Sequence, residues 1–426
     1  MKVKKTMPSV LQQLQARGVT FVVPETTHVA PDVNPERIAP GVVIHPGCRL
    51  RGTSLSIGPG CVIGAEAPAT VCDCQLGANV HLAGGFFDRS TFLDGFKAGS
   101  GAHVRPGCLF EEESSIAHSV GVKQTVFLPW VTAGSLINFC DALVAGGTGP
   151  KDHSEIGSSY IHFNFTPHQD KATPSLIGDV PNGVLLNQPP VFLGGQGGMV
   201  GPCRIAFGTV LPAGQIWRGD MTIPSRLVAK PGIRASVDCA FDPLRFNNLA
   251  RILRNNLIYW GNLLALDAWY RNVRTLFLRD DPFAKACHAG ARQRLAEILR
   301  DRMIRLEELA QKVGQSLSRP DAATDENRRF VEAWPAWRHA LDRKLVSLNT
   351  EPVPEEVRQT FSAFTTGIPY LDAVRALTAE HGQTLSAWLA SFPNGLDAWC
   401  EALHTSDPVP HPPGMPRHRA NGDIPT

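Results

Sequence analysis

Apolar residues recur at every sixth position in residues 104–130. The repeating residues are Val104, Phe110, Ile116, Val122 and Leu128. An α-helix repeats its apolar face about every 3.6 residues and a β-strand about every two, so neither element explains this period. A parallel β-helix does, because each six-residue unit forms one flat side of a triangular coil and directs its aliphatic side chain inward. The pattern therefore predicts a solenoid of hexapeptide repeats.

A short phrase of the form aliphatic-x-Pro-Gly-Cys supports this interpretation. It occurs three times, and its cysteines are Cys48, Cys61 and Cys108. Glycine tolerates the positive φ of a coil corner, and a small residue after it fits the narrow interior. Each buried aliphatic side chain contributes about 1.5–3 kcal/mol, whereas ordering each residue costs about 1–2 kcal/mol, so only a stack of coils is stable. A β-sandwich is the alternative, but its strands alternate with period two.

Beyond about residue 225 the apolar spacing becomes helical. Residues 249–278 and 294–317 carry apolar side chains three or four positions apart, as amphipathic helices do. Shorter helical patterns follow at about 325–345, 354–366 and 371–404. Near the N-terminus, residues 9–18 predict a short helix that closes the first coil.

The predicted fold class is mainly β plus α, a left-handed parallel β-helix followed by an α-helical C-terminal domain. A length of 426 residues is typical of two or three domains. The predicted boundaries are 1–30 for an N-terminal cap segment, 31–225 for the β-helix, 226–405 for the helical domain and 406–426 for a disordered Pro-rich tail.

Composition narrows the function classes. Lys and Arg number 41 against 39 Asp and Glu, and a formal charge of +2 gives no electrostatic argument for nucleic acid or a membrane surface. The 10 cysteines are too sparse for a disulfide scaffold, which favours reduced, mostly buried thiols and a cytoplasmic location. No run of about 18 apolar residues predicts a membrane span, and no apolar run follows the basic N-terminus as in a secretory signal.

Some hexapeptide β-helices are metal-dependent carbonic anhydrases, which place three neutral histidines around zinc. His81, His103 and His118 lie in the appropriate part of the chain. The chain lacks the His-x4-His pair of that family, so we predict no metal site and treat these histidines as polar edge residues.

Four segments in a fixed order carry a more specific resemblance. They are VRPG at 104–107, VK at 122–123, AGSLINFCDA at 133–142, and NF at 164–165 with Lys171 ahead of LIGD at 176–179. Together they resemble the acetyltransferase half of the bifunctional enzymes that make UDP-N-acetylglucosamine (UDP-N-acetylglucosamine pyrophosphorylase/glucosamine-1-phosphate N-acetyltransferase). The resemblance covers about residues 36–220, and the segment before it has no room for a uridyltransferase domain.

The resemblance implies a set of substrate-binding residues. Arg105 and Lys123 would hold the phosphate of the sugar, which suits a guanidinium and an ammonium group. Asn164 would bind the amine or acetamido end, with Phe165 where the family has Tyr. Lys171 would lie on the loop that follows.

The chain departs from the family at its catalytic base. Ser135 stands where the family has histidine, and Asn138 stands where it has tyrosine, so the resemblance implies that both are substrate-binding residues. A serine hydroxyl is a poor proton acceptor near neutral pH, whereas an imidazole with a pKa of about 6.5 is a good one. His162 and His168 flank Asn164 and are therefore the candidates for a replacement base.

These observations favour a hexapeptide-type transferase that binds an amino sugar phosphate or a nucleotide sugar. If it is active, the resemblance implies acyl transfer from acetyl-CoA or another acyl-CoA. It also implies a homotrimer, because the sites of the family lie between neighbouring β-helices. The alternative is a non-catalytic trimeric scaffold that recruits a partner through its helical extension.

Overall fold

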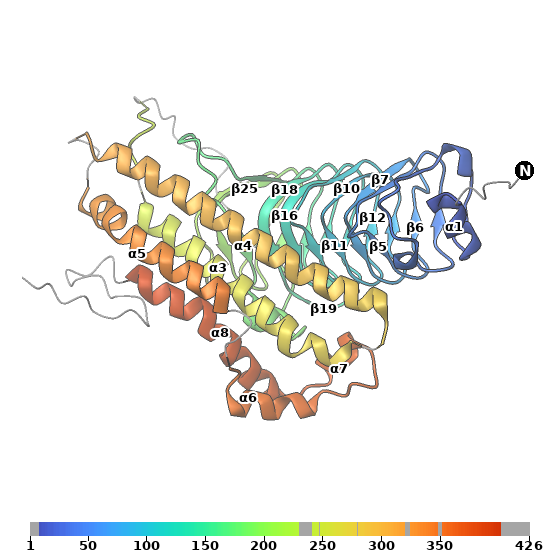
Figure 1. The fold of residues 1–426 in the computed structure, drawn as a ribbon. Helices are drawn as coiled ribbons and strands as arrows, with labels where there is room; N and C mark the ends of the chain where they lie inside the picture. The colour runs from blue at the N-terminus through green and yellow to red at the C-terminus, as the bar shows by residue number, and fades with distance from the viewer. Residues whose placement is uncertain are drawn as a thin grey trace, which may run out of the picture.

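The structure is a computed structural model that describes residues 8–229, 241–246, 248–278, 280–319, 324–347 and 352–401. Within these ranges the chain forms a parallel β-solenoid followed by a set of helices (Figure 1). The predicted fold class is confirmed. The predicted tail at 406–426 lies outside the described residues.

Short parallel strands form three faces of the solenoid, which we call the first, second and third faces. The first face is a 10-stranded sheet. In spatial order its strands are β1 (Thr20–Phe21), β3 (Val43–Ile44), β6 (Val62–Ile63), β9 (His81–Leu82), β12 (Lys97–Ala98), β15 (Ser115–Ile116), β17 (Thr132–Ala133), β21 (Glu155–Ile156), β24 (Phe192–Leu193) and β27 (Val210–Leu211).

The second and third faces are joined in one 16-stranded sheet, because β16 (Gly121–Phe127) and β18 (Asn138–Val144) continue around the corner between them. The second face contains the first halves of these two strands with β2 (His28–Val29), β4 (Arg49–Arg51), β7 (Ala69–Cys72), β10 (Gly85–Asp88), β13 (Ala102–Val104), β22 (Ile161–Phe163), β25 (Gly198–Val200) and β28 (Ile216–Arg218). The third face contains their second halves with β5 (Ser56–Ile57), β8 (Gln75–Leu76), β11 (Thr91–Phe92), β14 (Leu109–Phe110), β23 (Ser175–Ile177) and β26 (Arg204–Ile205). An antiparallel hairpin of β19 (Gly147–Gly149) and β20 (Asp152–His153) leaves this stack.

The predicted hexapeptide ladder forms the interior, with one exception. Val104, Phe110, Ile116 and Val122 are buried in the solenoid core. Leu128 instead packs into the apolar cluster formed with the helices, so its inward assignment is wrong. Phe127 is the inward residue there and pairs with Phe110. The repeat shifts by one residue because β16 runs continuously through the corner.

The corner phrase behaves as predicted. Cys48, Cys61 and Cys108 are fully buried. The glycine before Cys108, Gly107, has a φ of 85°, a backbone conformation that side chains other than that of glycine rarely adopt.

An N-terminal helix, α1 (Val10–Ala16), closes the first coil, as predicted. Ser9 and Gln12 form a reciprocal capping box at its start, and Leu14 enters the solenoid core. Strands β1 and β2 pair with β3 and β4, so the stack already includes residues before position 31.

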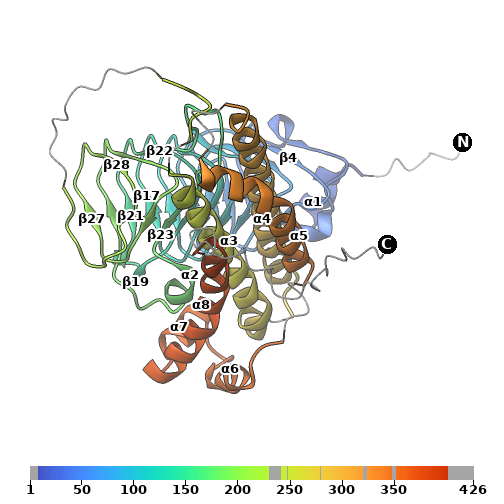
Figure 2. The ribbon, with the colours of Figure 1, turned by 90° about the vertical axis from the view of Figure 1, so that its left-hand side faces the viewer.

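The C-terminal helices lie on one side of the solenoid (Figure 2). The helices after α1 are α2 (Val180–Gly183), α3 (Leu249–Asn272), α4 (Pro282–Ser316), α5 (Asp325–Ser347), α6 (Glu355–Thr360), α7 (Tyr370–Arg375) and α8 (Ala379–Glu401), and the 3-10 turns are η1 (Pro24–Thr26), η2 (Pro35–Arg37), η3 (Arg274–Phe277) and η4 (Phe361–Ala363). In the part of the chain that the structure describes, no helix is long and apolar enough to cross a membrane.

Helix α4 covers the third face. It contacts β5, β8, β11 and β14 in turn, and α3 contacts β23 further along the stack. Helix α4 begins at Pro282, well before the predicted start at residue 294, with Asp281 as its N-cap. The sequence pattern missed these first turns because a small residue, Gly290, faces the solenoid there. Among the described helices, none runs along the second face in this way, and Arg105, Lys123 and Asn138 lie on that face.

Candidate functional site

Three of the predicted substrate-binding residues meet on the second face. Val104 pairs with Val122, which places Arg105 beside Lys123, and Lys123 in turn pairs with Cys140. Arg105 Nη2 donates to Cys140 Sγ at 2.9 Å. The Cys140 thiol lies 3.5 Å from Asn138 Oδ1 and donates to it. We call these four residues, Arg105, Lys123, Asn138 and Cys140, the Arg105 cluster.

The Arg105 cluster carries two positive charges without a neutralising carboxylate. Burial raises the pKa of Cys140 to about 11, although the Arg105 and Lys123 charges oppose that rise. The sulfur is therefore a neutral thiol near neutral pH. Among the described residues, no ion pair involves Arg105 or Lys123, and both side chains are half-buried. Two such cations on one surface suit a phosphate.

Gly121 leaves an open space beside this cluster. Gly121 pairs with His103 on one side and with Asn138 on the other. On these three adjacent strands, the glycine without a side chain therefore lies between an imidazole and an amide. A Cβ added at Gly121 would find its nearest neighbour, the Ile137 carbonyl oxygen, 3.8 Å away. A side chain at this position would therefore begin without a close contact.

Asn164 lies at the edge of the cluster and is tied to helix α4. Its amide nitrogen donates to Asp141, and Asp141 also accepts from Arg302 Nη2 at 2.8 Å. Arg302 further donates to Gln124 at 3.0 Å and to the Lys171 carbonyl at 3.1 Å. Because the Arg302 side chain is only 1% exposed, this network fixes Asn164 from beneath the surface.

Phe165 and Lys171 lie together on the loop after Asn164. The Lys171 ammonium is 5.9 Å from the centroid of the Phe165 ring, and the ring is 57% exposed. Thr173 donates to the Asn164 carbonyl at 2.8 Å and closes the base of this loop. No direct contact joins Phe165 or Lys171 to Arg105 among these interactions.

The two predicted replacement bases lie elsewhere. His162 is 2% exposed inside the solenoid, where Nδ1 donates to the Cys140 carbonyl and Nε2 lies 2.8 Å from Ser175 Oγ. Burial lowers its pKa, which favours the neutral ring. His168 donates through Nδ1 to the Pro243 carbonyl at 2.8 Å and stacks on Phe246. Local contacts therefore hold both rings, and a role of either as the replacement base stays a prediction.

Ser135 has a partner that the sequence pattern did not suggest. His118 Nδ1 lies 2.8 Å from Ser135 Oγ, one coil earlier on the same corner. The corners stack because Ile116 pairs with Ala133, and each of the two residues follows its strand residue by two positions. The pairing register of β15 and β17 is what places His118 beside Ser135. The sequence alone does not give this register, because the number of residues per coil varies along the chain.

The three histidines considered for zinc are not brought together. His81 lies on the first face in β9, His103 lies on the second face in β13, and His118 lies at the corner between them. Across the described ranges, no group of three His, Cys, Asp or Glu side chains is placed to hold a metal ion.

Comparison with known proteins gives this surface a context. No family model matches the chain. The bifunctional protein GlmU of Trichlorobacter lovleyi is 28% identical over 219 residues, which are 51% of this chain and 42% of that protein. The Thermus thermophilus protein of the same name is 31% identical over 189 residues, 44% of this chain and 37% of that protein. The similarity to these GlmU proteins thus covers about half of this chain.

The chain spans about two fifths of the length of the GlmU relatives, at 42% for the Trichlorobacter lovleyi protein. Its β-solenoid agrees with the acetyltransferase half of GlmU, which is a left-handed β-helix. The predicted resemblance to the acetyltransferase half of that family is confirmed for the solenoid. The helical region after the solenoid lies outside the segments on which the resemblance was based.

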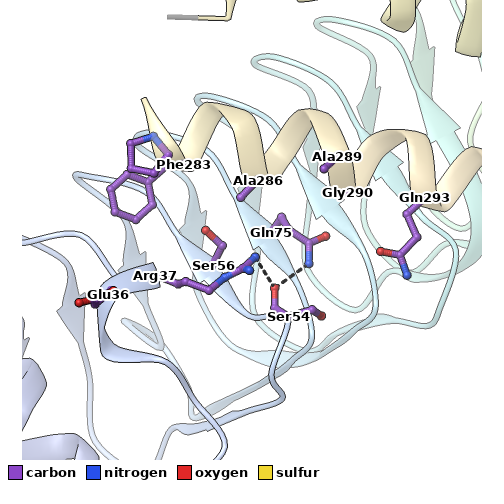
Figure 3. A pocket seen from close by; sticks show the side chains of 11 residues that line it. Glu36, Arg37, Ser54, Ser56, Gln75, Phe283, Ala286, Ala289, Gly290 and Gln293 are labelled. Atoms are coloured by element: carbon purple, nitrogen blue, oxygen red, sulfur yellow. Dashed lines mark hydrogen bonds between the residues drawn. The ribbon is translucent and has the colours of Figure 1, made fainter. Parts of the chain in front are cut away.

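Two hollows of the described residues lie away from the Arg105 cluster. One of about 450 Å³ lies between the first coils and the start of α4, where Arg37 and Gln75 both donate to the Ser54 carbonyl (Figure 3). Another of about 530 Å³ lies between the solenoid, α3 and α7 and includes Arg274 and Tyr370. Arg105 and Lys123 line neither of these two hollows.

Proposed function

We propose that this chain binds an amino sugar phosphate on its second face and transfers an acyl group to the sugar amine from acetyl-CoA or a related thioester. Arg105 and Lys123 hold the phosphate, and Asn138 and Asn164 contact the sugar. A nucleotide sugar presents the same phosphate chemistry and is the alternative ligand of the same residues.

The observation that carries this proposal is the Arg105 cluster. Arg105 bonds to the Cys140 thiol and Lys123 lies beside Cys140 on the neighbouring strand, and neither cation has an ion pair among the described residues. The face that holds them is not covered by α4, and about half of the chain matches GlmU proteins. The two cations and the two asparagine amides match the charge and hydrogen-bonding groups of a sugar phosphate.

The test measures thiol release from acetyl-CoA with glucosamine 1-phosphate and a panel of related amino sugars, alongside direct binding of each sugar phosphate. Arg105→Ala removes a charge-assisted contact and is expected to weaken binding about 10- to 100-fold. Arg51→Ala is the matched control, because Arg51 is an exposed arginine at the N-terminal end of the same face.

Equal binding by wild type, Arg105→Ala and Arg51→Ala would refute the phosphate site. Binding and turnover absent from the whole panel would instead favour the trimeric scaffold, with the helices α5 to α8 as its recruiting surface.

The proposal includes a homotrimer in the cytoplasm. Light scattering on the purified chain is expected to give three times the chain mass of 46.2 kDa. A strict monomer at all concentrations would contradict the trimeric arrangement for both the enzyme and the scaffold.

A further inference from the structure

His118 is an exposed histidine held by a single side-chain hydrogen bond. Its Nδ1 lies 2.8 Å from Ser135 Oγ, and the Leu136 amide donates to the His118 carbonyl at 3.1 Å. The Ser135 amide donates to Ser158 Oγ at 3.1 Å in the next coil. Three stacked corners therefore fix the position of the imidazole without burying it.

The side chains stacked with His118 on this corner are serines. The neighbouring corner side chains are Ser119, Ser135 and Ser158, and the described residues include no ion pair of His118. His162 and His168 differ, because the first is enclosed in the core and the second is stacked against Phe246.

The hydrogen bond to Ser135 also determines which ring nitrogen of His118 is free to accept a proton. When Nδ1 carries the proton and donates to Ser135 Oγ, the lone pair of the neutral ring lies on Nε2. Nε2 has no partner among the described contacts and is exposed with the ring. The serine thus acts as the group that orients an imidazole base.

His118 and Ser135 lie on the corner that leads into the second face, where the Arg105 cluster lies. Gly121 follows His118 by three residues and Asn138 follows Ser135 by three, and three residues span at most about 10 Å. Gly121 has no side chain to separate the imidazole from Lys123. A sugar phosphate held by Arg105 and Lys123 would extend across Gly121 toward His118.

We propose that His118 is the proton acceptor of the acyl transfer and that Ser135 is its positioning residue, an inference that rests on the proposed function. The sugar amine attacks the thioester carbonyl carbon, the C–N bond forms and the C–S bond breaks. His118 Nε2 takes the proton from the attacking nitrogen and passes it to the departing thiolate, which leaves as free CoA thiol. The base has moved from the position of Ser135 to the preceding coil.

The test compares steady-state kinetics of His118→Asn, Ser135→Ala and Ser135→Thr with those of wild type. His118→Asn keeps a donor toward Ser135 but no base, so kcat is expected to fall about 100-fold or more while sugar phosphate binding is unchanged. The acidic limb of the kcat/KM pH profile should disappear with it. Ser135→Ala should lower kcat less, and Ser135→Thr should restore it because the hydroxyl returns.

The matched control is His81→Asn, an exposed histidine on the first face, which should leave the pH profile unchanged. Wild-type turnover that survives His118→Asn with at least half its kcat would overturn the role of His118 and leave the proposed function intact. Absence of turnover in wild type would overturn the acyl transfer and the base together.

Discussion

At the residue scale, Cys140 shows how burial and charge compete in the candidate site. Its sulfur accepts from Arg105 and lies beside Lys123, and such positive neighbours usually lower a thiol pKa and activate it. The surrounding burial is the larger effect and raises the pKa to about 11. Cys140 is therefore expected to orient Arg105 as a neutral acceptor and not to act as a nucleophile.

We predict that Cys140 resists alkylation near pH 8, since a pKa of about 11 leaves about one thiol in a thousand ionised. Iodoacetamide labelling followed by peptide mass spectrometry measures the rate at each cysteine. Among the eight cysteines of the described residues, Cys72 is only half-buried on the same face and should be labelled first. Rapid labelling of Cys140 that Arg105→Ala abolishes would show instead that the cation outweighs burial.

At the element scale, the sequence pattern predicts the coils well and their alignment poorly. The hexapeptide ladder identifies inward residues because each flat side buries one side chain, and that holds for Val104 through Val122. Where a strand continues around a corner, as in β16, the phase shifts and the assignment of Leu128 fails. Because the phase of the repeat and the alignment of the coils are not known from the sequence, the inward position of His162 and the contact of His118 with Ser135 were not predicted.

Helix α4 shows a second kind of failure, because its docking depends on small residues. A Cβ at Gly290 would lie 2.3 Å from Gln75 Oε1 and 2.7 Å from Thr91 Oγ1. Gln75 is buried and already bonded to the Ser54 carbonyl and to Thr91, so it cannot move without losing these bonds. Large apolar side chains at these positions would prevent α4 from lying so close to the third face. The apolar helical repeat therefore begins only later in α4.

We predict that Gly290→Ala lowers the free energy of unfolding by about 1–3 kcal/mol, because the added methyl overpacks the contact between α4 and the third face. Denaturant unfolding followed by circular dichroism measures it. Gly314→Ala in the same helix is the control, since its nearest neighbour is Val331 at 3.9 Å. That variant should gain about 0.5–1 kcal/mol from helix propensity. Equal midpoints for the two variants would contradict the close approach.

At the scale of the whole molecule, a buried polar network joins the solenoid to the helices. Arg274 of η3 forms ion pairs with Glu111 at 2.9 Å and with Glu112 at 2.6 Å. The Tyr270 hydroxyl of α3 donates to Glu111 at 2.7 Å, and the Arg274 guanidinium lies 4.0 Å from the Tyr370 ring centroid. The sequence could not predict this network, because its members are far apart along the chain and carry no local pattern.

This network gives the molecule a pH-dependent stability term. Burial raises the pKa of Glu111 from 4.5 to about 7, against the opposing effect of Arg274. Between these values the folded state keeps a proton that the unfolded state has released. The contribution of Glu111 to stability is therefore complete below about pH 4.5 and is lost as the pH rises through about 7.

We predict that Glu111→Gln keeps the fold and changes the pH dependence of the free energy of unfolding. The amide cannot titrate, and Arg274 keeps its ion pair with Glu112, so the free energy of unfolding of the variant relative to wild type should rise between about pH 5 and about pH 8. Urea titrations at several pH values measure this difference. Glu113→Gln, an exposed neighbour bonded to Trp130, should give a curve parallel to wild type. If the Glu111→Gln curve were also parallel, Glu111 would be ionised throughout and Arg274 would outweigh its burial.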